Sequence, residues 1–205
     1  MNEQYDFTTE KKVKETRSIW HEVFDWIESI GITFLCVFFA LTFCFRVVTI
    51  EGDSMMNTLI EGEKVVISNL FYEAKQGDIV VISRNYKNDP DMVPNESNSP
   101  IIKRVIATEG QWIDIDFEEG IVYVGNSVET MQPYKEDYIR NLTTVPGDFE
   151  GPQQIEKGHV FVLGDNRSVS LDSRYDEIGQ VDTNYILGKA YFRLTPFEKF
   201  GTIYN

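Results

Sequence analysis

The sequence predicts a mainly β protein, in which a single N-terminal membrane-spanning helix precedes a barrel-like domain of packed antiparallel sheets. Two observations lead to this prediction. A long uncharged apolar run lies near the N-terminus, and the chain after it consists of short β-type runs separated by turns rich in glycine and aspartate. Short strands at such spacing, with few helix signals between them, are typical of β-barrels and packed sheets.

The apolar run extends from Ile30 to Phe45 and contains no charged residue. A membrane-crossing helix needs about 20 residues, and the apolar residues on both flanks lengthen the run to that extent. We therefore place a transmembrane anchor at residues 27–48, after a polar tail at residues 1–26. A buried core helix is the alternative, but the run is apolar on all sides rather than along one stripe. A cleaved signal peptide is disfavoured because no site of small residues closes the run.

Basic residues are more frequent before the apolar run than after it, which predicts the orientation of the anchor. Positively charged residues near a span tend to stay in the cytoplasm, so we expect a single-pass protein of the cell membrane with a cytoplasmic N-terminus. Residues 49–205 then form an extracytoplasmic domain. The two cysteines, Cys36 and Cys44, lie inside the run and are expected to be small apolar side chains.

The predicted strands of the extracytoplasmic domain are rich in valine, isoleucine and aromatic residues. Residues 84–100, which are dense in Asn, Asp, Ser and Pro, predict an exposed loop without a catalytic role. Residues 130–157 are polar and contain several prolines, and they predict either a long loop or a small subdomain. The strands are expected at Val47–Ile50, Lys64–Ser68, Asp78–Ser83, Ile101–Ala107, Trp112–Ile115, Ile121–Val124, His159–Leu163 and Lys189–Leu194.

Charge and composition exclude several classes of function. The formal net charge is −14 at pH 7, and a domain this acidic is repelled by the phosphates of nucleic acids. No spacing of cysteine, histidine and carboxylate residues suggests a metal site, so we expect neither a metal nor another cofactor.

The segment Thr49–Leu59 carries a candidate nucleophile, Ser54. Gly52 has access to backbone angles that other residues avoid and lets a second chain come close, while Met55 and Leu59 supply apolar surroundings. Gly-Asp-Ser is also ordinary turn chemistry, and such a triplet is more often a surface turn than a reactive site. Ser54 by itself therefore leaves both interpretations open.

A lysine interrupts the apolar run Ile101–Ile106. If Lys103 lies on the buried side of this strand, burial lowers its pKa and makes a neutral amine available as a general base. A serine can then be activated without a histidine. The alternative is an edge strand on which Lys103 points to solvent.

The third segment, Gly164–Arg174, follows an apolar strand and reads Gly-Asp-Asn-Arg-Ser-Val-Ser-Leu-Asp-Ser-Arg. In this order, and behind an apolar anchor, the three segments resemble the bacterial type I signal peptidases, which are membrane-bound Ser-Lys proteases. Gly-Asp-Ser-Met-Met resembles the nucleophile motif of that family, Ile-Lys-Arg-Val its general-base motif, and the third segment its longest signature. The resemblance covers nearly the whole chain but is only general over residues 84–100 and 114–150.

The resemblance implies a catalytic role for two residues and support roles for six others. Ser54 is the implied nucleophile, with its backbone N–H as one oxyanion donor, and Lys103 is the general base that Ser170 orients by a hydrogen bond. No second oxyanion donor is assigned, because Gly52 stands where some members carry a serine. Asp172 and Arg174 are expected to pair and hold the loop, with further support from Asp165, Arg167 and Arg104.

The resemblance also implies the substrate, namely precursor proteins that bear an N-terminal signal peptide, cut after small residues of the Ala-x-Ala type at a membrane surface. The side chains expected to form the small substrate pockets are Ile50, Met55, Leu59, Ile101 and Ile102. Two alternatives remain. One is a Ser-Lys protease that cleaves itself or a regulatory protein, and the other is an inactive membrane-anchored β domain that binds exported chains.

Overall fold

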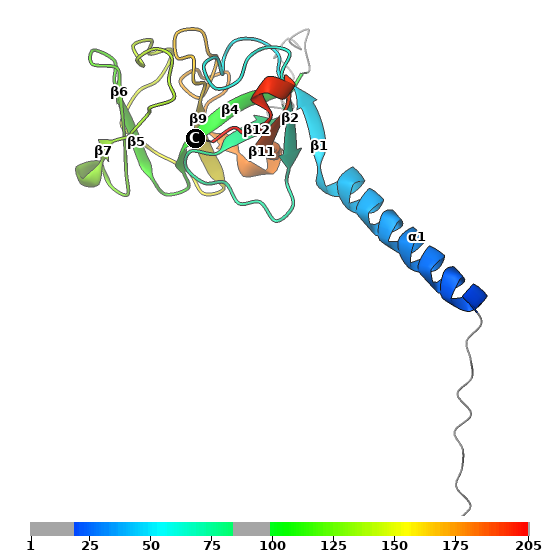
Figure 1. The fold of residues 1–205 in the computed structure, drawn as a ribbon. Helices are drawn as coiled ribbons and strands as arrows, with labels where there is room; N and C mark the ends of the chain where they lie inside the picture. Colours follow the sequence, from blue (N-terminus) through cyan, green and yellow to red (C-terminus); the bar gives the residue numbers. More distant parts are fainter. Residues whose placement is uncertain (1–18, 84–98, 205) are drawn as a thin grey trace, which may run out of the picture. The chain divides into compact units, whose positions relative to one another are not determined.

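The computed structural model describes residues 19–83 and 99–204, and the chain divides into two compact units between Leu41 and Thr42 (Figure 1). Helix α1, Ile19–Cys44, forms the described part of the first unit and extends into the first residues of the second. None of its side chains is buried, and it is the one helix among the described residues that is long and apolar enough to cross a membrane.

The helix differs in extent from the predicted anchor at residues 27–48. It begins earlier, at Ile19, because Trp20 and Phe24 continue the apolar composition into the segment that was assigned to the tail. It ends at Cys44, and the residues up to 48 belong to the first strand instead, since Val47 and Val48 pair with valines of the next strand. The predicted tail at residues 1–18 lies outside the described residues.

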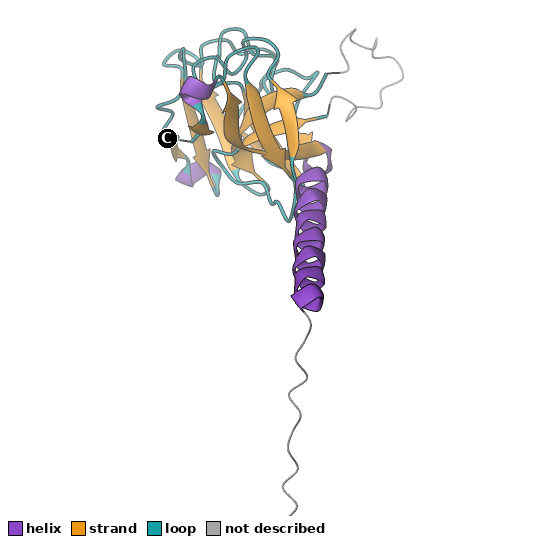
Figure 2. Cartoon of the chain, turned by 45° about the vertical axis from the view of Figure 1, so that its right-hand side comes forward, coloured by secondary structure: helices purple, strands orange, loops and turns teal. Residues whose placement is uncertain are grey.

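The second unit contains two antiparallel sheets (Figure 2). The larger has eight strands in the order β1-β2-β11-β3-β4-β9-β10, with β12 paired to β11. Every strand pair within it is antiparallel, so the prediction of a mainly β protein with antiparallel sheets is confirmed. Its strands are β1 (Arg46–Thr49), β2 (Lys64–Ser68), β3 (Ile79–Ile82), β4 (Ile101–Thr108), β9 (His159–Leu163), β10 (Val181–Asp182), β11 (Ile186–Thr195) and β12 (Gly201–Thr202).

The smaller sheet, which we call the second sheet, has the order β7-β6-β5-β8. Its two long strands form a hairpin, and residues 130–157 supply a two-residue strand at each edge. This segment lies in the same compact unit as the other strands of the second sheet. The strands are β5 (Trp112–Asp116), β6 (Ile121–Gly125), β7 (Gln132–Pro133) and β8 (Gln153–Gln154), and three short 3-10 turns lie at Val128–Thr130, Thr183–Tyr185 and Phe197–Lys199.

Three apolar clusters hold the sheets together. One cluster joins β2, β3 and β11 to Met55 and Leu59, which lie in the turn after β1. A second cluster packs the second sheet against β4 and β9 through Ile106 and Phe161, and a third covers the opposite face around Val105. Strand β4 contributes to all three clusters, because its eight residues run through the middle of the larger sheet and turn directly into β5. Side chains on both faces of β4 are therefore packed against apolar clusters, and its backbone pairs with strands on both edges.

Candidate active site

Ser54 lies in a short turn between β1 and β2, which we call the Ser54 turn (residues 52–59). The turn closes through backbone hydrogen bonds, from the N–H of Met56 to the carbonyl of Asp53 at 3.0 Å and from the N–H of Leu59 to the carbonyl of Met55 at 2.9 Å. The side chains of Met55 and Leu59 are fully buried and anchor the turn in the core. Ser54 itself remains partly exposed.

Lys103 lies on β4, between β3 and β9, so it does not occupy an edge strand. Only 3% of its surface is exposed. Its amine Nζ donates to the hydroxyl Oγ of Ser54 at 2.9 Å and to the carbonyl of Ile102 at 3.0 Å. The structure therefore brings the two residues of the sequence hypothesis into direct contact across 49 positions of the chain.

The loop after β9, residues 164–174, is the long signature of the sequence, and we call it the signature loop. Its C-terminal end is held by an ion pair in which both Asp172 and Arg174 are fully buried. Arg174 binds both carboxylate oxygens, at 2.8 and 3.0 Å, and donates further to the carbonyls of Val145 and Arg167. The second oxygen of Asp172 also accepts the N–H of Gly164 at 3.0 Å, so this pair ties the two ends of the loop together.

A second buried ion pair joins the signature loop to β4. Arg104 binds both oxygens of Asp165, at 2.9 and 2.6 Å, and its guanidinium lies 3.7 Å from the ring centroid of Tyr138. Burial by itself lowers the pKa of Arg104, but the hydrogen bonds and charge of Asp165 outweigh it and raise the pKa. Arg104 follows Lys103 directly on the strand, and its side chain points to the opposite face.

A third ion pair joins the signature loop to the segment between β7 and β8 of the second sheet. Arg167 is almost fully buried and pairs with Glu136. It also donates to the hydroxyl of Thr143 at 2.5 Å and to the carbonyl of Gly164 at 2.9 Å. The five residues predicted to support the site by charge, Arg104, Asp165, Arg167, Asp172 and Arg174, are therefore all buried around this loop.

Ser170 is buried beside the site but does not make the hydrogen bond that the family resemblance implies. Within the described part of the chain, its hydroxyl has no hydrogen-bond partner, whereas Lys103 donates to Ser54 and Ile102. The packing there is close, because a Cβ on Gly164 would lie 2.2 Å from Ser170 Oγ and 2.5 Å from the carbonyl oxygen of Ser54. Only glycine fits between them, so Gly164 lets the signature loop approach the Ser54 turn.

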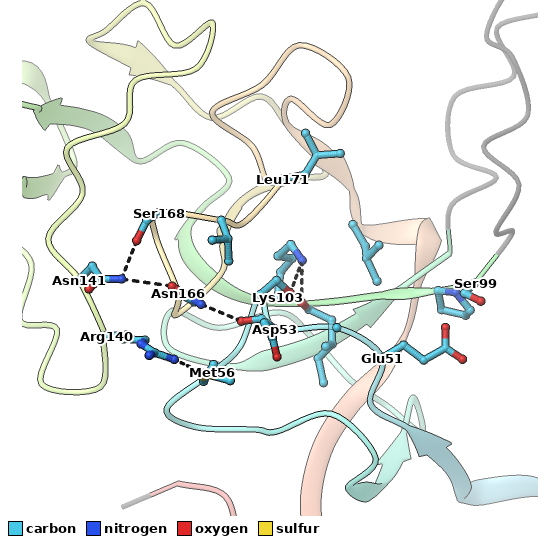
Figure 3. A pocket seen from close by; sticks show the side chains of 16 residues that line it. Glu51, Asp53, Met56, Ser99, Lys103, Arg140, Asn141, Asn166, Ser168 and Leu171 are labelled. Carbon is cyan, nitrogen blue, oxygen red and sulfur yellow. Dashed lines mark hydrogen bonds between the residues drawn. The ribbon is translucent and has the colours of Figure 1, made fainter.

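Asn166 is a site residue that the sequence hypothesis missed. Its backbone N–H donates to the carbonyl of Ser54 at 3.0 Å, and its side-chain amide donates to the carbonyl of Asp53 at 3.1 Å. Its own oxygen accepts from the amide of Asn141 at 3.2 Å, as the dashed lines of Figure 3 show. An asparagine inside a charged motif gave no separate signal, because backbone carbonyls of a distant turn are not visible in a sequence pattern.

The Ser54 turn, the start of β4 and the signature loop surround an open pocket of about 930 Å³. In Figure 3, Arg140, Asn141 and Ser168 lie at one end of this pocket and Glu51 and Ser99 at the other, with Lys103 between them. The predicted exposed loop at residues 84–100 lies outside the described residues except for Ser99 and Pro100, which line this pocket.

The predicted substrate-binding side chains divide into two groups. Ile101 and Ile102 line the pocket, as predicted by their place beside Lys103. Ile50, Met55 and Leu59 do not line it, and with exposed fractions of 2%, 0% and 0% they belong to the apolar core beneath the turn. Their expected role is corrected accordingly, because they fix the backbone of the turn and offer no surface to a ligand. Val169 and Leu171 of the signature loop are the apolar lining residues that the sequence did not indicate.

Comparisons with known proteins show the family to which the chain belongs. Residues 23–195 match the family model described as signal peptidase, peptidase S26. The chain belongs to this family. Signal peptidase IB of Staphylococcus aureus is 33% identical over 90% of this chain and 95% of its own length, and signal peptidase I T of Bacillus subtilis is 30% identical over 97% of both chains. A solved signal peptidase I of Enterococcus faecalis V583 has 19% identity and a TM-score of 0.36, covering 58% of this chain and 97% of that one.

As a member of the signal peptidase family, the protein is a protease. Within residues 19–83 and 99–204, no group of three or more His, Cys, Asp or Glu side chains is placed to hold a metal ion. The hydroxyl of Ser54 lies 2.9 Å from the buried amine of Lys103.

Proposed function

We propose that this signal peptidase removes N-terminal signal peptides from exported precursor proteins, with Ser54 as the nucleophile and Lys103 as the general base. The observation that carries the proposal is the 2.9 Å contact between the buried amine of Lys103 and the hydroxyl of Ser54. Both residues line a pocket of about 930 Å³, which we propose accommodates an extended peptide. A nucleophile within hydrogen-bond reach of its base is the geometry that covalent catalysis requires.

In the first half of the reaction, the neutral amine of Lys103 takes the proton of Ser54 while Oγ attacks the carbonyl carbon of the scissile peptide bond. The ammonium then gives this proton to the leaving nitrogen as the C–N bond breaks, and the signal peptide stays attached to Ser54 as an ester. The burial of Lys103 supports this role, because desolvation disfavours the charged form of an amine.

In the second half, Lys103 takes a proton from a water molecule that attacks the ester, and Ser54 recovers its proton as the signal peptide leaves with a free carboxylate. The negative charge on the carbonyl oxygen develops in both halves and needs donors aimed at its position. We assign one of these donors to the backbone N–H of Ser54. The hydrogen bonds of Asn166 to the carbonyls of Asp53 and Ser54 support this assignment, because they restrain the peptide group that contains this N–H and the peptide group after it.

For the substrate, we propose an extended chain that enters the pocket along the start of β4, where Ile101 and Ile102 provide apolar contacts. We propose that the residues before the cleaved bond are small, of the Ala-x-Ala type, because the branched side chains of Ile101, Ile102 and Leu171 line the pocket and leave less room for a large side chain. We propose that Ser170 orients the amine of Lys103 only in a state in which this amine has left its contacts with Ser54 and Ile102.

We further propose that helix α1 anchors the protein in the cell membrane as a single span, with the N-terminus in the cytoplasm and the β domain on the outer side. The proposal is supported by the length and apolar composition of the helix, by the absence of any buried side chain on it, and by the basic residues before it. Confining the enzyme and its membrane-held precursor to one surface raises their effective concentration.

The test is cleavage of a purified precursor with an Ala-x-Ala sequence by the full-length protein in detergent, followed by sequencing of the new N-terminus. We expect cleavage directly after the second alanine, loss of cleavage in Ser54→Ala and in Lys103→Met, and loss when that alanine is replaced by Phe. Matched controls are Ser127→Ala and Lys157→Met, which change a half-buried serine and an exposed lysine outside the pocket. Precursor binding without cleavage by the wild-type protein would instead identify an inactive binding domain.

A further inference from the structure

A second pocket, of about 580 Å³, lies beside the Ser54 turn and shares no lining residue with the pocket at Ser54. It is lined by four cationic side chains from separate parts of the chain, namely Arg104, Lys135, Arg193 and Lys199. Among the residues that the structure describes, Asp137 is the one acidic residue that lines this pocket. Such a collection of positive charge is notable in a protein with a net charge of −14.

Within residues 19–83 and 99–204, the four cations of this pocket pair with three carboxylates. Arg104 is paired with Asp165, and Lys135 pairs with Asp137 at 2.6 Å. Arg193 and Lys199 share a single carboxylate, that of Glu63, which is only 5% exposed. Among the residues that the structure describes, Arg193 and Lys199 therefore have one carboxylate between them, at the end of the pocket where β11 passes into the turn at Phe197–Lys199.

The donors of these two residues are also incompletely used. Among the described residues, Nη2 of Arg193 donates to the carbonyl of Thr58. Its Nε lies 3.0 Å from Glu63 in an ion pair whose direction is not that of a hydrogen bond. The amine of Lys199 lies 3.6 Å from Glu63, beyond hydrogen-bond distance. Buried and half-buried N–H groups of a cation are normally paired, because leaving them without an acceptor is costly.

The remaining walls do not oppose an anion. Tyr138 and Tyr204 line the pocket, and burial raises the pKa of both phenols, so both stay neutral. The hydroxyl of Tyr138 donates to Glu136, and that of Tyr204 accepts the N–H of Ile79. The guanidinium fork of Arg193 matches the planar geometry of a carboxylate or two oxygens of a phosphate.

We infer that this pocket is a binding site for a small oxyanion, a phosphate or carboxylate group held by Arg193 and Lys199 with Lys135 at the entrance. Both groups present negatively charged oxygens to the pocket. Either a soluble metabolite or a lipid headgroup could supply such a group. Arg193 also donates to the carbonyl of Thr58. A group bound to Arg193 is therefore connected through this one side chain to the turn that carries Ser54.

Binding is measured on the full-length protein in a zwitterionic detergent, by titration with inorganic phosphate against sodium chloride at matched ionic strength. We expect a saturable rise in melting temperature with phosphate only. Lys199→Gln should weaken the binding about tenfold, because it removes one charge-assisted hydrogen bond. Lys157→Gln, at an exposed lysine outside the pocket, is the control and should bind phosphate as the wild type does. Equal effects of phosphate and chloride, or unchanged phosphate binding by Lys199→Gln, overturn the inference.

The source of the anion is tested after reconstitution into vesicles of phosphatidylcholine or phosphatidylglycerol. If a lipid headgroup occupies the pocket, the affinity for phosphate falls in phosphatidylglycerol, and Lys199→Gln removes this difference while Lys157→Gln retains it. If the ligand is soluble, the wild type and Lys157→Gln bind phosphate equally well in both lipids. Absence of saturable phosphate binding in both vesicle types contradicts the assignment of the pocket.

Discussion

The signature loop and the second sheet are both well packed, but different interactions hold them. The signature loop has little regular secondary structure, and its backbone is positioned by ion pairs and side-chain hydrogen bonds around Asp165, Arg167 and Arg174. The second sheet is held by regular antiparallel pairing and by an apolar cluster that includes Ile113 and Val122. The loop contacts the Ser54 turn directly, whereas no residue of the strands of the second sheet lines the pocket at Ser54.

This difference teaches how the protein positions its reactive residues. An irregular loop cannot satisfy its buried backbone groups by strand pairing, so charged side chains supply the missing partners. A buried ion pair contributes little net stability compared with an apolar replacement, but removal of one partner is costly. We therefore expect the signature loop to be sensitive to single changes in charge, and the second sheet to tolerate small changes in volume.

The largest effect is expected for Asp172→Ala, which leaves Arg174 buried without its carboxylate. The free energy of unfolding should fall by about 3–5 kcal/mol, as measured by denaturant unfolding of the full chain in detergent, and cleavage should be lost. The double variant Asp172→Leu, Arg174→Met should regain most of the stability without regaining activity. A loss below about 1 kcal/mol for the single variant would mean that the loop does not depend on this pair.

The next effect concerns Asn166, which contacts the carbonyls on both sides of the Ser54 N–H. Asn166→Asp keeps the shape of the side chain but removes the donor to Asp53, so the rate of cleavage should fall about 10- to 100-fold with a smaller change in KM. Asn184→Ala, at an exposed asparagine distant in sequence, is the control. If Asn166→Asp lowers the thermal stability enough to account for the whole loss of cleavage rate, Asn166 has a purely structural role.

A smaller effect is expected in the second sheet. Ile113→Val removes one methylene from a fully buried side chain, which should lower the free energy of unfolding by about 1 kcal/mol, while the rate of cleavage stays unchanged. Both are measured on the same preparation. A change in rate comparable with that of Asn166→Asp would show that the second sheet and the Ser54 turn are coupled.

The smallest effect is expected for the exposed ion pair of Lys135 and Asp137, whose side chains are 82% and 74% exposed. Asp137→Asn should change the free energy of unfolding by less than about 1 kcal/mol, because solvent screens such pairs. If this change matches the effect of Asp172→Ala, burial is not what distinguishes the two ion pairs.

Much of the fold could be predicted from local patterns. The apolar run predicted the helix, and the main strands were placed within a few residues because Val- and Ile-rich segments alternate with turns that contain Gly and Asp. The two-residue strands β7, β8, β10 and β12 were missed. Each pairs with a longer neighbour only after the chain has folded, and a segment so short has no periodicity of its own.

The candidate site was predicted in part. Ser54, Lys103 and the charged residues of the signature loop were identified by motif, but Ile50, Met55 and Leu59 were assigned to a substrate pocket because a pattern of apolar residues does not distinguish a buried wall from an exposed one. Asn166 and the cationic pocket around Arg193 were not predicted, since the residues involved are separated by tens of positions.

The amino-acid sequence by itself determined the kinds of element, the membrane-length helix and the chemistry of the reactive residues, because these depend on the composition and order of neighbouring residues. Tertiary packing decided that Lys103 faces Ser54 while Arg104 faces Asp165, and that the buried hydroxyl of Ser170 has no hydrogen-bond partner among the described residues. The physical reason is that a strand offers two faces, and the choice between them follows from what the other strands and loops bury on each side.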